Sequence, residues 1–216
     1  MIVSNRISAG WSLAALAVVA LLGGAAMAQS SFTPDTGSVG TEVVITGSGF
    51  GAGGKAMLVD STTGATKPVT TALTVTSWTD TQIVADVNKA PKGGLKDYGV
   101  EVAPKGSAAA AIPGTFTLAP LSLSGVSPET GAVGSTIAIN GNYFGSKKGK
   151  VSLLVSGPKG IVAKACKVAT WTMNPATGAS TATAALPKVP AGTYQLVVDN
   201  GLSNATWTND ITVTGP

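Results

Sequence analysis

The fold is decided by a stretch that occurs twice: PDTGSVGTEVVITGSGFG at residues 34–51 and PETGAVGSTIAINGNYFG at residues 128–145. Seven landmarks of the first copy recur 94 positions later with no gap: Pro34, Gly37, Gly40, Ile45, Gly47, Phe50 and Gly51. A constant offset across so many positions indicates an internal duplication. We therefore expect two tandem domains with the same fold, and the copies assign residues 31–118 to the first and 121–214 to the second.

Short alternating segments follow each copy and predict β-strands. Residues 41–46 place Val43 and Ile45 on one face, and residues 82–87 alternate in the same way. The second unit repeats this order, with small changes in loop length. Seven short strands per unit, separated by turns rich in Gly, Pro, Asn and Asp, are typical of an antiparallel β-sandwich. The sequence therefore predicts an all-β protein made of two immunoglobulin-like β-sandwiches.

A tyrosine opens the sixth strand of each unit, at Tyr98 and Tyr194. This is the placement of a tyrosine corner, in which the hydroxyl bonds a nearby backbone group. Both residues are therefore expected to be structural. The linker between the units, Ala119-Pro120, predicts restricted motion because proline fixes its own φ.

Residues 1–28 have the pattern of a secretory signal peptide. Arg6 supplies the positive end, an apolar run extends from about Trp11 to Leu22, and Ala26-Met27-Ala28 forms a small-x-small cleavage site. The alternative is an uncleaved N-terminal anchor. The rest of the sequence has no second apolar run of membrane length, so we expect no membrane span in the mature chain, and export to the cell envelope or medium.

Composition excludes several classes of function. After residue 28 the chain has 13 Lys, no Arg and 10 acidic residues, and this net charge of +3 is too mild to predict nucleic-acid binding. The sequence has no His, which removes the usual general base and most zinc sites, so we expect no enzyme, no cofactor and no metal. Oxygens at Asp199-Asn200-Gly201 could suit calcium, but turn formation explains them more simply. Cys166 is the only cysteine, which predicts a buried thiol, the alternative being an intermolecular bridge.

The pattern Pro-x-x-Gly-x-x-Gly-Thr-x-Val-x-Ile-x-Gly-x-Gly-Phe-Gly resembles the IPT/TIG family of immunoglobulin-like domains, found in plexins and transcription factors. The stretch SWTDTQI at residues 77–83 resembles the next signature of that family. The second copy departs from the pattern at Asn142-Tyr143, where Gly is usual, and at residues 171–173, where the Asp is missing. The resemblance implies an early-Set (E-set) immunoglobulin fold and a module of secreted or surface proteins in bacteria. It implies no catalytic residue, because the family shares none.

Charge is unevenly divided, with net −1 in the first unit and net +4 in the second. Candidate binding residues are two groups of lysines, one in a single loop and one across the hairpin that follows: Lys147, Lys148 and Lys150, then Lys159, Lys164 and Lys167. If the two groups lie side by side, they form a basic patch able to hold an anionic surface polymer. The alternative is a solvated face that keeps the protein soluble.

Trp207 is the other candidate, because Ile112 occupies the matching place in the first unit. It could stack on a sugar ring, or pack in the core or between the units. Two functions remain open. One is a secreted or cell-envelope, non-enzymatic module for adhesion, binding or spacing, with an envelope or extracellular protein as partner. The alternative is a protein that binds carbohydrate or an anionic surface polymer.

Overall fold

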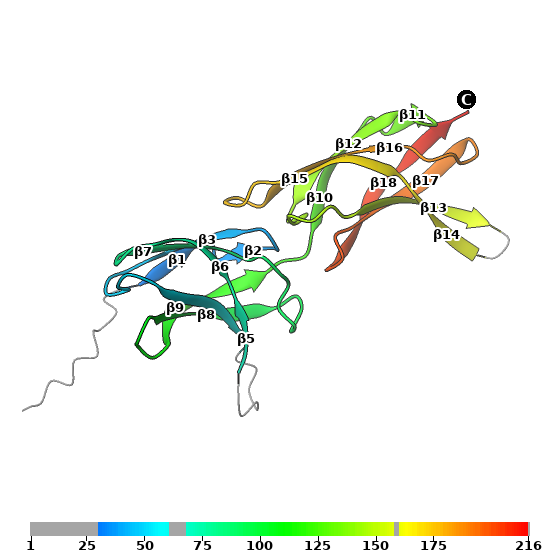
Figure 1. Ribbon diagram of the computed structural model, residues 1–216. Coiled ribbons are helices and arrows are strands. Elements are labelled where there is room, and N and C mark those ends of the chain that lie inside the picture. The colour runs from blue at the N-terminus through cyan, green and yellow to red at the C-terminus, as the bar shows by residue number, and fades with distance from the viewer. Residues whose placement is uncertain (1–29, 61–67, 158–159, 216) are drawn as a thin grey trace, which may run out of the picture.

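The structure is a computed structural model that describes residues 30–60, 68–157 and 160–215. The predicted signal peptide, residues 1–28, lies outside these ranges. Figure 1 shows two β-sandwiches in tandem, joined by a short connection. The prediction of an all-β fold with two equivalent sandwiches is confirmed.

Nine strands form each domain within the described residues. Domain one contains β1 (Ser31–Thr33), β2 (Thr36–Gly37), β3 (Glu42–Thr46), β4 (Gly54–Asp60), β5 (Val69–Ala72), β6 (Thr74–Trp78), β7 (Gln82–Asp86), β8 (Asp97–Pro104) and β9 (Ala110–Leu118). Domain two contains β10 (Ser122–Ser127), β11 (Thr130–Ala132), β12 (Thr136–Asn142), β13 (Lys150–Gly157), β14 (Gly160–Ala165), β15 (Lys167–Met173), β16 (Ala179–Ala185), β17 (Gly192–Asp199) and β18 (Asn204–Thr214).

The two domains share one topology. Their four-stranded sheets have the orders β1-β3-β7-β6 and β10-β12-β16-β15, and their five-stranded sheets have the orders β2-β9-β8-β4-β5 and β11-β18-β17-β13-β14. The predictions of seven strands and of purely antiparallel pairing are wrong. β2 and β11 cross to the second sheet and pair parallel with β9 and β18. They have two and three residues, too few to show a period of two. The other additional strands, β5 and β14, are outer strands that extend the five-stranded sheets.

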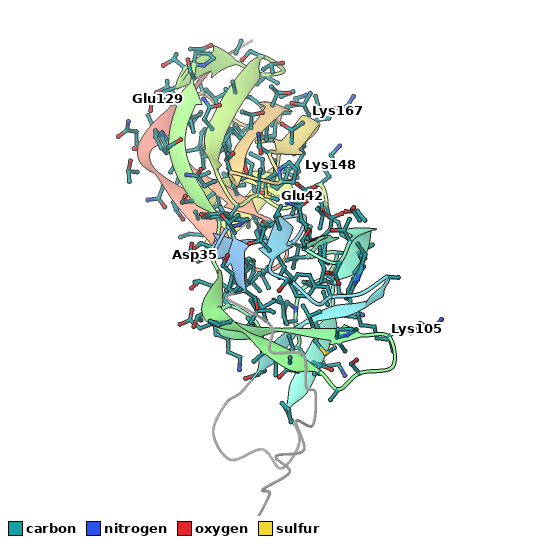
Figure 2. The ribbon with its side chains drawn as sticks, turned by 90° about the vertical axis from the view of Figure 1, so that its left-hand side faces the viewer. Asp35, Glu42, Lys105, Glu129, Lys148 and Lys167 are labelled. Atoms are coloured by element: carbon teal, nitrogen blue, oxygen red, sulfur yellow. The ribbon has the colours of Figure 1, made fainter. Side chains whose placement is uncertain are left out.

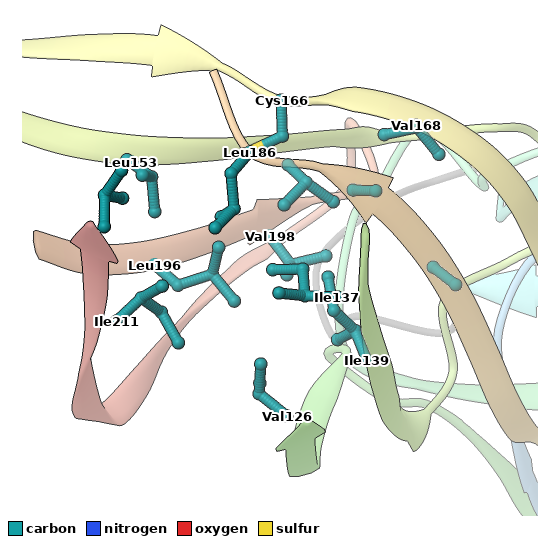
Figure 3. Packing of buried hydrophobic residues seen from close by; sticks show 14 of the residues in the cluster. Val126, Ile137, Ile139, Leu153, Cys166, Val168, Leu186, Leu196, Val198 and Ile211 are labelled. Atoms are coloured by element: carbon teal, nitrogen blue, oxygen red, sulfur yellow. The ribbon is translucent and has the colours of Figure 1, made fainter. Parts of the chain in front are cut away.

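Inward-facing residues from both sheets form one core in each domain. In domain one, Val43, Ile45 and Val100 are fully buried. In domain two, the alternating residues of β12, β13 and β17 meet between the sheets, as Figure 3 shows for Ile137, Leu153 and Leu196. The buried face of each strand follows the predicted alternation, because successive side chains of a strand point to opposite faces.

The phenylalanine near the end of each repeated motif packs against a tryptophan later in the same domain. Phe50 and Phe144 are fully buried, and their ring centroids lie 6.5 Å from Trp78 and 5.1 Å from Trp171. The indole N–H of Trp78 donates to the carbonyl of Phe50 at 3.1 Å, and that of Trp171 to the carbonyl of Gly145 at 3.0 Å. The motif therefore closes the end of each sandwich.

Both predicted tyrosine corners are confirmed. The hydroxyl of Tyr98 donates to the carbonyl of Gly94, and that of Tyr194 to the carbonyl of Pro190, each at 2.7 Å. Burial, and secondly the negative charge of Asp60, raise the pKa of Tyr98. The hydroxyl therefore stays protonated and able to donate at neutral pH.

Candidate functional site

Two backbone hydrogen bonds join the domains directly. The N–H of Ser146 donates to the carbonyl of Val39 at 2.9 Å, and the N–H of Glu42 donates to the carbonyl of Pro175 at 3.0 Å. Val39 lies in the loop before β3, and Ser146 directly follows the second copy of the repeated motif. Glu42 lies where the domains meet (Figure 2). We call this contact region the joint.

Glycines allow the close approach at the joint. Gly40 has φ +97°, and a Cβ there would lie 2.7 Å from Ser146 Cβ and 3.0 Å from Ser146 N. Gly145 has φ +87°, and its Cβ would lie 3.3 Å from the carbonyl oxygen of Val39. Gly134 is the counterpart of Gly40 in domain two, and its Cβ would meet nothing within 4 Å. The same glycine therefore serves a turn in both domains and an interface in only one.

The connection between β15 and β16 is longer than its counterpart between β6 and β7, and it reaches domain one (Figure 1). Asn174 folds this loop, because its side-chain oxygen accepts from the N–H groups of Ala176 at 3.0 Å and Thr177 at 3.1 Å. The carbonyl of Gly178 accepts from the N–H of Tyr143 at 2.8 Å. The loop is thereby held in position to present Pro175 to Glu42.

Tyr143 explains the departure of the second copy from the motif. It has φ +61° where the first copy has Gly49 at +78°, and it is the one non-glycine residue with positive φ in the described ranges. Its ring lies against Gly178, where a Cβ would come within 2.3 Å of the ring. The strained backbone of Tyr143 is therefore held by the loop that reaches domain one.

The linker is tied to both domains. The N–H of Ala119 donates to the carbonyl of Gly37 at 2.8 Å, and the N–H of Leu121 donates to the hydroxyl of Ser203 at 2.9 Å. Leu202, from the turn between β17 and β18, packs against the core of domain one. The side-chain oxygen of Asn200 accepts from the N–H of Leu202 at 2.9 Å, which fixes this turn. These contacts agree with the restricted motion predicted from the proline.

A cleft of about 160 Å³ lies within the joint. Its walls come from both domains and include Ser38, Val39, Lys89, Gly145, Lys147 and Leu202. Ser38 is only 1% exposed, and its Oγ has no hydrogen-bond partner among the described residues. The cleft is therefore a mostly apolar hollow with a buried hydroxyl in its wall, and neither domain forms it alone.

The predicted lysines do not all come together. Lys147 borders the cleft, and the adjacent Lys148 and Lys150 share a second hollow of about 140 Å³ with Asp199. Lys164 is opposite Leu153 in register and so faces the other side of that sheet from Lys150.

Lys167 opens β15 in the other sheet, beside Cys166, whose N–H donates to the carbonyl of Val151 at 2.8 Å. Figure 2 shows Lys148 and Lys167 projecting on the same side of domain two. Lys159 lies outside the described residues. The structure therefore groups Lys147, Lys148 and Lys150, and separates Lys164 from them.

Trp207 lies on β18, half-buried, and packs against the core of domain two. Its indole N–H donates to Glu129 Oε1 at 2.8 Å, and the amide of Asn209 donates to the same oxygen at 2.8 Å. Hydrogen bonds from Asn209, and then from Trp207, lower the pKa of Glu129. Trp207 is therefore one member of a small polar cluster in domain two.

The groups that could support catalysis are few. Cys166 is buried as predicted, and burial raises the pKa of its thiol to about 11, so it is neutral at physiological pH. Asp199 Oδ1 accepts from the N–H of Gly201 at 2.6 Å, as expected for a turn. Within the described ranges, no group of three or more His, Cys, Asp or Glu side chains could hold a metal ion. Over the same part of the chain, no helix is long and apolar enough to cross a membrane.

The model of the IPT/TIG domain matches residues 29–118 and residues 121–214. The chain belongs to the IPT/TIG family. No curated protein matches the sequence.

Three of the solved structures that resemble this tandem of IPT/TIG domains are larger proteins. The full extracellular region of plexin A4 is 14% identical, with a TM-score of 0.44, over 85% of this chain and 18% of that chain. SGBP-B, from a complex xyloglucan utilization locus in Bacteroides uniformis, is 22% identical, with a TM-score of 0.38, over 86% of this chain and 48% of that chain. Gamma-CGTase from alkalophilic Bacillus clarkii is 14% identical, with a TM-score of 0.34, over 86% of this chain and 26% of that chain. The chain thus spans less than half the length of each.

Two signals of the joint are visible in the sequence, although the sequence alone does not show that they concern an interface. The departures at Tyr143 and around Trp171–Met173 both belong to the elements that carry the joint: Tyr143 contacts the β15–β16 loop, and Met173 directly precedes it. Ser38 carried no signal, because it is the other domain that buries it. The counterpart of Ser38 in the repeat is Ala132, which is exposed.

Proposed function

We propose that this IPT/TIG protein is a secreted or cell-envelope, non-enzymatic module that binds or spaces other molecules as one rigid two-domain body. The observation that supports this most directly is the joint, in which Ser146 and Glu42 donate backbone hydrogen bonds across the domain boundary. Backbone bonds need close approach, and Gly40 and Gly145 permit it. A fixed angle keeps the surfaces of the two domains in one relation, as a spacer or a two-domain binding surface requires.

The joint is specific to this pair of domains. It uses residues at which the two copies differ, namely Tyr143 and the loop that carries Pro175. Equivalent scaffold residues form the cores, whereas these departures form the contact between domains. Ser38 and Lys147 then bring surfaces from both domains to one place.

The test follows export and retention of the full tagged chain in its own organism. We expect the exported protein to begin at Gln29 by mass spectrometry and to be retained on intact cells or envelopes. Gly40→Ala should reduce retention several-fold because it disturbs the joint, whereas the matched variant Gly134→Ala should not. Accumulation of an unprocessed chain in the cytosol, or equal retention of both variants, would contradict the proposal.

A second candidate function is binding of a carbohydrate or an anionic surface polymer. It is favoured by the loop at the joint that brings Lys147, Lys148 and Lys150 together. Clustered lysines concentrate positive potential and attract polyanions in a salt-dependent manner. Trp207 stays part of this candidate because its ring is only half-buried.

Charge reversal tests this second candidate. Combined replacement of Lys147, Lys148 and Lys150 by Glu should abolish salt-sensitive retention on immobilised polygalacturonate, with neutral dextran as the comparison. Lys164→Glu, on the opposite sheet face, should retain binding. If polygalacturonate quenches tryptophan fluorescence in the native chain but not in Trp207→Phe, the sugar stacks on Trp207. Unchanged retention of the triple variant would reject the lysine loop.

A further inference from the structure

We propose that the cleft in the joint binds a single carboxylate group, held by Ser38, Lys89 and Lys147. The ligand class is a small organic acid or the uronic acid end of a glycan. This inference deepens the second candidate function and rests on it for the negative charge of the ligand. It also requires the joint, because the cleft has walls from both domains.

Ser38 points to a ligand because its hydroxyl is buried without a partner. Its backbone is satisfied, since the N–H donates to Thr41 Oγ1 at 2.9 Å and the carbonyl accepts from the N–H of Thr41 at 3.0 Å. Its Oγ has no hydrogen-bond partner among the described residues, although the residue is 1% exposed. Buried polar atoms in native proteins are nearly always hydrogen-bonded, so an exception calls for an explanation.

The fold itself does not require this hydroxyl. The repeat places Ala132 at the same position of domain two, where the equivalent turn forms with alanine: the N–H of Ser135 donates to the carbonyl of Ala132 at 3.0 Å, as that of Thr41 donates to Ser38. In domain one the second domain covers the position, so an alanine there would leave no unsatisfied group. A serine at a position where burial penalises its hydroxyl fits a hydroxyl that serves the cleft.

The hydroxyl faces a wall that has no side chain. A Cβ built on Gly145 would lie 3.9 Å from Ser38 Oγ, and both residues line the cleft. Gly145 has φ +87°, a conformation that favours glycine at this position. The buried hydroxyl therefore lies in the wall of the cleft, beside a residue that has no side chain.

Two other polar side chains at the cleft are donors only. The third, Asn200, already donates its amide to the carbonyl of Tyr143 and accepts from the N–H of Leu202. Lys89 from domain one and Lys147 from domain two are exposed at its border, and the described lining includes no Asp or Glu. Ammonium groups are donors only, and a hydroxyl can donate as well. Three donors with two positive charges fit an acceptor that carries negative charge.

The volume of the cleft and its apolar walls further restrict the class of ligand. A volume of about 160 Å³ holds roughly five water molecules, at about 30 Å³ each, and so admits a carboxylate with a short body. Val39, Ala90 and Leu202 line the rest, and their apolar surface suits a ring or a short carbon chain. The cleft therefore fits the end of a glycan or a free acid, and not the interior of a polymer.

The test titrates the full two-domain chain with sodium glucuronate and follows backbone amide resonances. Glucose is the neutral match, and acetate and inorganic phosphate separate the carboxylate from the sugar body and from other oxyanions. We expect shifts at Ser38, Gly145 and Lys147 with glucuronate, weaker shifts with acetate, and none with glucose. Stronger binding of phosphate than of either carboxylate would overturn the assignment of the ligand class.

Substitutions test which side chains hold the carboxylate. Ser38→Ala should weaken glucuronate binding about tenfold, the effect of one hydrogen bond to a charged acceptor. Lys89→Gln and Lys147→Gln should each weaken it as well. Lys188→Gln should leave the affinity unchanged, because Lys188 does not line the cleft. Lys188 is the match of Lys89 in domain two: each lysine lies two residues after the carbonyl, of Leu186 or Val87, that accepts from the equivalent glycine N–H.

Two results would overturn the cleft as the site. One is an absence of shifts at the cleft with every anion, and the other is equal affinity in Ser38→Ala and the native chain. Tumbling of the Ser38→Ala chain reports the joint separately. If the two domains of the native chain tumble together and yet no anion binds in the cleft, the cleft proposal fails and the rigid module stands. If Lys148→Gln weakens binding as much as Lys147→Gln, the lysine loop binds anions without the cleft.

Discussion

Replacing Phe144 with alanine is expected to destabilise domain two by about 3–5 kcal/mol, the usual cost of removing a large aromatic side chain from a core. Phe144 is fully buried, its ring lies 5.1 Å from that of Trp171, and its N–H donates to Ser180 Oγ at 3.1 Å. Small domains are stable by only about 5–15 kcal/mol, so this loss takes a large share of the total. Calorimetry should show a lower unfolding temperature for domain two, whereas the unfolding temperature of domain one should change little.

The duplication supplies the matched variant. Phe50→Ala removes the counterpart ring of domain one, which is also fully buried, and should lower the other transition by a similar amount. Ile161→Ala serves as the surface control because Ile161 is 71% exposed. A loss below about 1 kcal/mol for Phe144→Ala would mean that the end of the sandwich is not packed as described.

Replacing Gly40 with alanine should separate the motions of the two domains. The new Cβ would lie 2.7 Å from Ser146 Cβ, so the two chains must move apart, and the bond from the Ser146 N–H to Val39 is then lost. Gly40 also has φ +97°, which costs alanine roughly 1–2 kcal/mol whatever lies nearby. The backbone cost must therefore be measured separately from the collision.

The matched variant Gly134→Ala measures the backbone cost without the collision. Gly134 has φ +85° and equivalent bonding, since its N–H donates to the carbonyl of Leu186 as that of Gly40 donates to Val87. Its Cβ would meet nothing within 4 Å, so only the backbone cost remains. Nitrogen-15 relaxation should show faster, independent tumbling of the domains in Gly40→Ala and joint tumbling in Gly134→Ala. Joint tumbling in both variants would show that the collision does not open the joint.

Much of the fold follows from local patterns. The repeated motif, the alternation in β3, β7 and β12, and the two tyrosine corners each depend on residues close in sequence, and the structure confirms them. β2 and β11 could not be predicted, because two or three residues carry no period and their partners are at the far end of the domain. The outer strands β5 and β14 face solvent over most of their length and lack an alternating apolar face.

The candidate site was less accessible to sequence reasoning. Lys147 is a candidate binding residue because lysines are its neighbours in the sequence. Its place at the cleft, however, depends on the contact between the two domains. Ser38 and Gly40 belong to the repeated motif, and a motif that recurs in both domains suggests residues that serve each fold rather than a contact between the domains. The structure shows that one copy of the same loop also contacts the other domain. The departures at Tyr143 and around Trp171–Met173 mark the joint in the second copy, but neither copy alone shows which residues of the other domain they meet.

The parallel pairing of β2 with β9 and of β11 with β18 has a consequence for a chain under tension. Each pair joins a strand near the entry of the domain to the strand at its exit, and the two run in the same direction. A pull on the two ends of a domain therefore drags these neighbours past each other along their length. The hydrogen bonds between them share the load and must break together, whereas a hairpin pulled at its open end loses its bonds one at a time. Each domain thus has a mechanical clamp at the point where the chain enters and leaves.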